Sequence, residues 1–229
     1  VLQLDRTLAD VLRWVGEKVG VDRTLVVVSA DRGMPDAPEV LASQGMKVGR
    51  IDPSDIVDLA DAATKRKFGT DVSFVKSFFR PYLYLDANAI GKADLDQELV
   101  EETIAEEIMT NDGIALAVSM KSLPTLQNTA TLERIRNNHH PARSGDVYVV
   151  QKPYWFLQEG NEIAVMHGSP WRYDTYVPII FSGVGLRGRT VNRPVRPVDI
   201  APTLAAVLGI KPPSSTSGEP LVEVLQDTD

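Results

Sequence analysis

The sequence predicts an α/β fold, and three observations support this prediction. Apolar residues recur at helical spacing from Leu4 to Val19, which indicates a helix with one buried face that ends at Gly20. A continuous apolar run rich in β-branched residues follows at 25–28, as in a strand covered on both faces in a mainly parallel sheet. Towards the end of the chain, a strand at 177–181 precedes a helix at 200–208. Helices therefore flank the predicted sheet.

The stretch 47–151 predicts a second unit with both helices and strands. The expected elements are a strand at 48–51, a helix from Pro53 to Phe68, strands at 72–79 and 82–85, a helix at 95–109, a strand at 114–118, a short helix at 132–136 and a strand at 146–151. This order is typical of a split βαβ arrangement. We therefore expect residues 47–151 to form an α+β subdomain inserted into a core made of residues 1–46 and 152–229.

The last helix has recognisable start and stop signals. Asp199 is the expected N-cap, Pro202 lies in the first turn, and Gly209 follows the last apolar residue. The Pro- and Ser-rich stretch 212–218 predicts a surface loop.

Composition excludes several classes of site. The 229 residues contain no cysteine, so any metal must be held by carboxylate and imidazole groups. A net charge of −7 argues against a surface that binds nucleic acid or anionic membranes. Apolar runs are far shorter than the ~20 residues of a membrane span, and no signal-peptide pattern opens the chain. The chain starts with Val1 inside a helical pattern, which favours a piece of a longer protein.

Two short segments carry possible chemistry. Residues 29–33 read SADRG and directly follow the first strand, where the carboxyl end of a parallel strand opens into a crevice. Taken alone, this segment slightly favours a strand-to-loop turn in which Asp31 caps the backbone. His167 precedes Gly168, and a lone histidine before glycine is more often a turn residue than a metal ligand.

Together, these segments resemble the alkaline phosphatase superfamily, in its type I phosphodiesterase branch. That branch carries Ala-Asp-His-Gly after a buried strand, and residues 167–178, which read HGSPWRYDTYVP, resemble its late His-Gly-Ser-Pro motif. The stretches 143–147 and 197–203, which read RSGDV and PVDIAPT, add two further matches in the same order. The resemblance implies a phosphatase- and sulfatase-like sheet of which this chain is the C-terminal half.

The resemblance also implies a chemistry. In the family, two divalent metals, usually zinc, lie at the carboxyl ends of the sheet and activate a Thr or Ser nucleophile that attacks a phosphate ester. One ion lowers the pKa of the nucleophile while the other stabilises the leaving oxygen. Many members act in the periplasm or outside the cell, so the resemblance implies such a location for the parent protein.

Transfer of the metal ligands to this chain is incomplete. Asp31 and His167 match family ligands, and the resemblance implies that both bind metal. Arg32 stands where the family has histidine, and a guanidinium stays protonated and has no lone pair to donate. Tyr176 stands where the branch has a second histidine, whose role the resemblance leaves open. The family's nucleophile and an Asp-x-x-x-His ligand pair are absent from the chain.

Other candidate residues favour structural roles. His139 and His140 are adjacent and point in different directions, so a loop is favoured over a metal pair. The acidic stretch 94–107 predicts a solvated helix face. Trp155 and Phe156 are more typical of packing than of a stacking platform, whereas Trp171 and Arg172 are candidates for lining the mouth of the site.

Two hypotheses follow from the sequence. The first is a C-terminal part of a metal-dependent phosphoric ester hydrolase, catalytically incomplete as this chain, whose structural partner is the missing N-terminal half. The second is a degenerate homologue that has lost metal binding and serves as a binding or scaffold protein. Arg32 and Tyr176 favour the second, whereas Asp31, His167 and the loops around them favour the first. No catalytic residue is assigned under either hypothesis.

Overall fold

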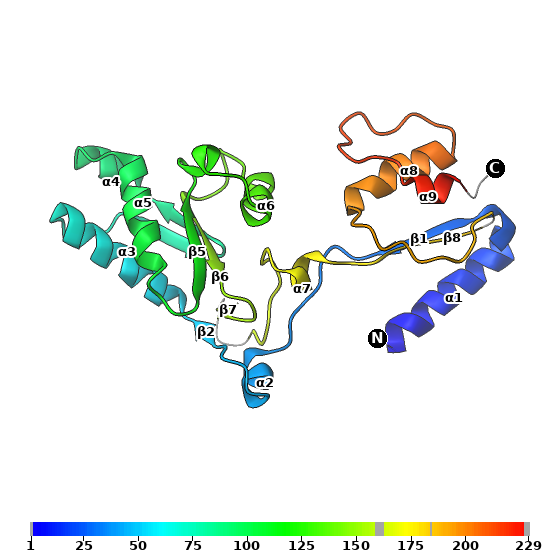
Figure 1. Ribbon diagram of the computed structural model, residues 1–229, viewed down its shortest axis with the longest axis horizontal. Helices are drawn as coiled ribbons and strands as arrows, with labels where there is room; N and C mark the ends of the chain where they lie inside the picture. Colours follow the sequence, from blue (N-terminus) through cyan, green and yellow to red (C-terminus); the bar gives the residue numbers. More distant parts are fainter. Residues whose placement is uncertain (1, 159–162, 184, 227–229) are drawn as a thin grey trace. The chain divides into compact units, whose positions relative to one another are not determined.

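The structure is a computed structural model that describes residues 2–158, 163–183 and 185–226. It consists of two compact units (Figure 1). The first comprises residues 1–31 and 177–229, and the second comprises residues 32–176. The α/β class is confirmed. The prediction that residues 47–151 form an insertion into a core of 1–46 and 152–229 stays a prediction.

The first unit has few strands and several helices. Its elements are α1 (Leu2–Lys18), the 3-10 turn η1 (Val21–Arg23), β1 (Leu25–Ser29), β8 (Ile179–Gly183), the 3-10 turn η3 (Pro197–Asp199), α8 (Ile200–Val207) and α9 (Val222–Leu225). β1 pairs with β8 in a two-stranded antiparallel sheet. The expected strand at 25–28 is therefore present, but its described neighbour runs antiparallel. An apolar run predicts burial on two faces and carries no information on the direction of the neighbouring strand.

The helix α1 differs from expectation in its exposure. Its bounds match the predicted helix, but none of its residues is buried. Most apolar positions at helical spacing are exposed, with Leu4 at 72% and Val11 at 50% of full exposure, and Val15 is half-buried. The expectation of one buried face is therefore wrong for the described residues.

Asp199 occupies the N-cap position of α8, as predicted, but its side chain makes no capping hydrogen bond to that helix. Instead, Oδ2 accepts the N–H of Arg196 at 2.8 Å and Oδ1 accepts the N–H of Glu219 at 3.0 Å. Asp199 therefore closes the 3-10 turn η3 and holds the incoming C-terminal segment, because η3 occupies the turn in front of the helix.

The second unit contains most of the secondary structure. Its helices are α2 (Pro38–Ser43), α3 (Pro53–Phe68), α4 (Ala87–Lys92), α5 (Gln97–Ile108), α6 (Ala130–Asn138) and α7 (Arg172–Thr175), with a 3-10 turn η2 (Leu123–Thr125). Its strands are β2 (Arg50–Ile51), β3 (Val75–Phe79), β4 (Tyr82–Leu85), β5 (Ile114–Ser119), β6 (Val147–Gln151) and β7 (Phe156–Leu157). The elements α3, α5, α6 and β2 to β6 lie at or near predicted ranges, whereas α2, α4, α7, η2 and β7 were not predicted.

A four-stranded antiparallel sheet organises this unit. Its strand order is β3-β4-β6-β5. The split βαβ pairing is wrong, because β2 does not join this sheet and pairs in parallel with β7. Element order along the chain does not fix which strands become neighbours, and β2 has only two paired residues.

Alternating side chains give the sheet two cores, one on each face. Leu83, Val147 and Val149 belong to one cluster, which α3 and α5 cover with Ile56, Ile104 and other apolar residues. Tyr82, Tyr148 and Val150 belong to the other, which α6 covers with Leu132 and Ile135. Both faces of the sheet are therefore buried, and the end of β6 at Gln151 is a rigid anchor for the loops that follow. Among the described residues, no helix has the length and apolar character needed to cross a bilayer.

Candidate functional site

The predicted ligands Asp31 and His167 lie on irregular segments next to regular elements. Asp31 comes two residues after the end of β1 and is exposed. Ser29, at the end of β1, donates its hydroxyl to the carbonyl of Pro178 at 3.0 Å. His167 is half-buried, and Gly168 after it has φ 109, a backbone conformation that glycine adopts without strain. Asp31 belongs to the first unit and His167 to the second, so their proximity stays a prediction.

A buried aspartate organises the segment that carries His167. Asp174 lies in the short helix α7 and is only 4% exposed. Its Oδ2 accepts two hydrogen bonds from Ser169, one from the backbone N–H at 2.7 Å and one from the hydroxyl at 2.6 Å. A carboxylate acceptor makes both bonds stronger than neutral ones. Asp174 therefore fixes the turn immediately after His167.

The same helix also holds the segment after β1. Gly33 donates its backbone N–H to the backbone carbonyl of Asp174 at 2.9 Å. A Cβ at residue 33 would lie 1.9 Å from the carbonyl oxygen of Tyr173, so only glycine fits this approach. Two sequence motifs about 140 residues apart, at Arg32–Gly33 and His167–Ser169, thus meet at α7 within the second unit.

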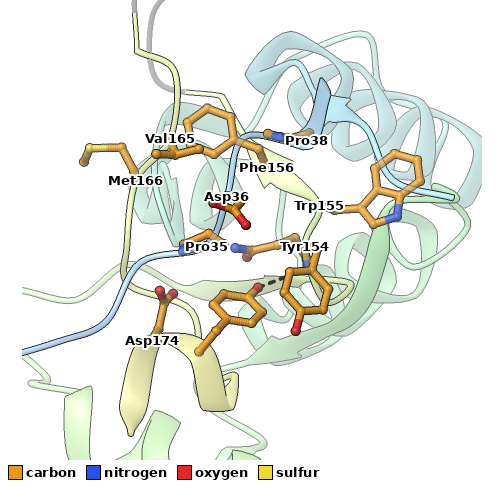
Figure 2. A pocket seen from close by; sticks show the side chains of 11 residues that line it. Pro35, Asp36, Pro38, Tyr154, Trp155, Phe156, Val165, Met166 and Asp174 are labelled. Carbon is orange, nitrogen blue, oxygen red and sulfur yellow. Dashed lines mark hydrogen bonds between the residues drawn. The ribbon is translucent and has the colours of Figure 1, made fainter. Parts of the chain in front are cut away.

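Aromatic residues tie α7 to the four-stranded sheet. Trp171 donates its indole N–H to the carbonyl of Gln151, at the end of β6, at 2.8 Å. The Tyr154 and Tyr173 rings stack with centroids 4.6 Å apart, and the hydroxyl of Tyr173 accepts the backbone N–H of Tyr154 at 3.1 Å (Figure 2). Burial raises the pKa of Tyr173, so this phenol stays protonated at neutral pH. Trp171 therefore anchors the segment between His167 and α7. Its predicted place at the mouth of a site stays a prediction.

A small cavity lies beside these residues, with Asp36, Tyr154 and Asp174 in its wall (Figure 2). Its volume is about 10 Å³, which is room for about one water molecule. The second oxygen of Asp174, Oδ1, is buried and has no hydrogen-bond partner among the described residues. The cavity is lined by Pro35, Asp36, Pro38, Gln151, Tyr154, Trp155, Phe156, Val165, Met166, Tyr173 and Asp174. Trp155 and Phe156 are thus packing residues of this wall.

Tyr176 and Arg172 lie next to each other on the surface. Tyr176 is 55% exposed, and the guanidinium of Arg172 lies over its ring at 4.4 Å from the centroid. A phenol has no imidazole nitrogen, and a neighbouring cation disfavours a second cation at this ring.

His140 has structural contacts, whereas the Nδ1 atom of its neighbour His139 is buried and has no hydrogen-bond partner among the described residues. The Nδ1 atom of His140 accepts the N–H of Ala142 at 3.2 Å, and the backbone N–H of His140 donates to the Ser144 hydroxyl at 2.9 Å. His140 thus stabilises a turn, in agreement with the prediction of a loop at this position. Within residues 2–158, 163–183 and 185–226, no three Asp, Glu or His side chains gather in a way that could hold a metal ion.

The acidic helix holds one residue that the sequence interpretation missed. The prediction of a solvated face is wrong for Glu101, which is 1% exposed. Its carboxylate accepts hydrogen bonds from the hydroxyl of Ser119 at 2.7 Å, the side-chain amide of Gln97 at 2.9 Å and the N–H of Lys121 at 3.3 Å. Burial raises the pKa of Glu101, although these donors partly oppose the shift. A sequence signal existed, because Glu101 stands three residues before the buried Ile104.

Asp174 was also missed as a separate feature, because it was noticed only as part of the late motif. Its spacing of five residues from Ser169, within a stretch rich in aromatic residues, was the available signal. The role of Asp174 depends on the burial of its side chain. That burial comes from the loops that surround α7.

Comparison with known proteins gives the family. Residues 1–170 match the sequence profile of the type I phosphodiesterase / nucleotide pyrophosphatase family. The chain belongs to this family. A calcium-transporting ATPase of Myroides odoratus is 29% identical over 98% of the chain and 41% of its own length. Alkaline phosphatase PafA of Elizabethkingia meningoseptica is 28% identical, with the same two coverages. Alkaline phosphatase PhoV of Synechococcus elongatus is 27% identical over 98% of the chain and 40% of its own length.

The fold of this phosphodiesterase-family chain agrees with the sequence match. The crystal structure of wild-type alkaline phosphatase PafA superposes with a TM-score of 0.85 and 26% identity, over 97% of this chain and 42% of that chain. The chain thus spans about two fifths of the length of these relatives. The resemblance to the alkaline phosphatase superfamily is confirmed, as is the α/β class.

Asp31 and His167 carry a carboxylate and an imidazole, which are donor groups that zinc accepts in proteins. Their role as metal ligands in this phosphodiesterase-family chain stays a prediction.

Proposed function

We propose that this chain is the C-terminal part of a phosphoric ester hydrolase of the alkaline phosphatase type, and that it is catalytically incomplete by itself. The observation that carries the proposal is the match to alkaline phosphatases over 98% of this chain and only about 41% of their length. Chemistry that needs a nucleophile and a metal pair requires groups beyond these two side chains. Phosphate esters are the proposed substrate class of the parent protein.

Within the proposal, Asp31 and His167 are metal ligands. A carboxylate oxygen and an imidazole nitrogen are donors that zinc accepts in proteins. Arg32, directly after Asp31, places a permanent positive charge beside the proposed ligand, and this charge repels a divalent cation. Zinc or another divalent metal is the proposed cofactor of the parent, held weakly or not at all by this chain.

The structural partner that we propose is the N-terminal part of the same parent protein. The exposed apolar positions of α1, which are Leu2, Leu4, Leu8, Val11, Leu12 and Trp14, support this proposal. Leu4, Leu8, Val11 and Leu12 recur at helical spacing, so they share one side of α1. An exposed apolar stripe of this kind indicates an interaction surface, because its exposure to water is unfavourable. A location in the periplasm or outside the cell follows for the parent only from its family membership.

The proposed domain division treats residues 47–151 as an insertion. The four-stranded sheet and the helices α3, α4, α5 and α6 all fall within this range, which supports the proposal. The proposed phosphatase core then comprises residues 1–46 and 152–229, which contain both predicted ligands.

A second candidate function is a non-catalytic binding or scaffold protein. The observation that favours it is the pair Arg32 and Tyr176, where both imidazoles of the family pattern are replaced. Reading the gene upstream of the codon for Val1 separates the two functions. A Thr or Ser nucleophile motif together with Asp-x-x-x-His supports the hydrolase, whereas their loss supports the binding protein.

A further inference from the structure

We propose that Asp174 is a positioning residue, which holds the turn after His167 and the segment after Asp31 in one fixed arrangement. The proposal rests on the proposed function only where it treats His167 as a ligand; the arrangement itself stands on contacts within the second unit. Asp174 has no assigned role in the proposed chemistry, and it need not touch a metal or a substrate to act in this way.

The side chain of Asp174 holds the turn that follows His167. Both donors of Ser169, its N–H and its hydroxyl, meet the same oxygen, at 2.7 and 2.6 Å. The hydroxyl of Ser169 also lies 3.4 Å from the backbone N–H of Trp171, so a single side-chain pair orients the turn on both sides of Pro170. Ser169 is 6% exposed and Asp174 is 4% exposed, so bulk solvent does not compete for these bonds.

The backbone of Asp174 holds the segment that follows Asp31. Its carbonyl accepts the N–H of Gly33 at 2.9 Å, two residues after Asp31. Gly33 also contacts the preceding carbonyl, that of Tyr173, so closely that no Cβ fits. The position of the Gly33 segment is therefore coupled to the orientation of the first turn of α7, which the Asp174–Ser169 pair holds.

Helix α7 is bonded to the end of β6 in the four-stranded sheet, so its position is fixed relative to that sheet. The indole of Trp171 bonds to Gln151 at the end of β6, and Tyr173 bonds and stacks with Tyr154. Four residues form no stable helix on their own, so these tertiary contacts maintain α7.

The carboxylate of Asp174 is explained by the two bonds that Oδ2 accepts from Ser169. Asp174 also lines the small cavity, which has room for about one water molecule.

The test measures amide hydrogen exchange by NMR in the full 229-residue chain. Asp174→Ala should raise the exchange rates of the Ser169 and Gly33 amides at least about tenfold, although the two side-chain hydrogen bonds described for Asp174 both go to Ser169. Asp174→Asn keeps an oxygen for both Ser169 donors and should restore both rates to within about threefold. Asp36→Ala is the matched control, because it removes an exposed carboxylate from the same cavity wall. It should change neither rate.

A second readout is zinc affinity in an Arg32→His background, where Asp174→Ala should weaken binding and Asp174→Asn should retain it. If Asp174→Ala does not fold, Ser169→Ala replaces it in both measurements, because it removes the hydroxyl that Asp174 accepts. Unchanged Gly33 exchange in Asp174→Ala, or failure of Asp174→Asn to restore it, overturns the proposal. If no background binds zinc while the exchange pattern holds, the positioning role is supported and the proposed metal site is the part that fails.

Discussion

A Cβ on Gly33 would lie 1.9 Å from the backbone carbonyl oxygen of Tyr173. This distance is far inside van der Waals contact, so the segment after β1 can meet α7 only through glycine. The contact explains why the two motif segments within the second unit depend on each other. A change at residue 33 should therefore affect the turn at Ser169.

Gly33→Ala should destabilise the second unit by about 1–3 kcal/mol, because either the Gly33 N–H bond to Asp174 or the Tyr173 carbonyl must shift. Urea unfolding measures the change in the free energy of unfolding. Gly91→Ala is the matched control, because Gly91 lies in α4 and a methyl group there would meet no other part of the chain within 4 Å. This control should raise stability by about 0.5–1 kcal/mol. Equal effects of the two substitutions would contradict the close approach at Gly33.

The buried carboxyl of Glu101 should make stability depend on pH. Burial raises its pKa in the folded chain above the ordinary value of 4.5, so the folded state binds more protons than the unfolded state above that value. The free energy of unfolding should therefore fall as pH rises from 4.5 through the raised pKa. Glu101→Gln should remove this part of the fall, as measured by urea unfolding across pH. Glu106→Gln, at an exposed position of the same helix, should leave the slope unchanged. An identical slope in Glu101→Gln and the parent chain would disprove the assignment.

The purified 229-residue chain should show no appreciable turnover of p-nitrophenyl phosphate with added zinc. The physical reason is that two candidate ligands supply neither a metal pair nor a nucleophile. The measurement is release of p-nitrophenol, with alkaline phosphatase PafA as the positive control. Turnover that Asp31→Ala abolishes would show that the chain is an enzyme by itself.

Much of the fold followed from local signals in the sequence. Helix α3 has the predicted bounds because its ends are locally encoded: the Asp52 side chain accepts the N–H of Ser54, Pro53 opens the helix, and Gly69 ends it with φ 68. Strand β4 and strand β6 also match their predicted ranges. By contrast, the antiparallel pairing of β1 with β8 depends on contacts between distant segments, which apolar runs do not specify.

The site was only partly predictable for the same reason. Asp31 was correctly placed just after a strand, because an apolar run ending in polar residues is a local signal. The role of Asp174 depends on Ser169 and Gly33 meeting it in a buried environment, and no local pattern reports that. Glu101 was assigned to a solvated face because charged residues surround it, yet the packing of α5 on the sheet turns that residue inward.

Zinc affinity of the Arg32→His chain, measured by calorimetry, tests the central claim that the chain carries an incomplete family metal site. The substitution adds an imidazole donor and removes the cation beside Asp31, so affinity should rise at least about tenfold over the parent, roughly 1.4 kcal/mol. His167→Ala in the same background should cancel the gain, and adding Tyr176→His reports whether that position contributes a ligand. No gain in Arg32→His, with no effect of His167→Ala in either background, would contradict the claim and leave a similarity of fold alone.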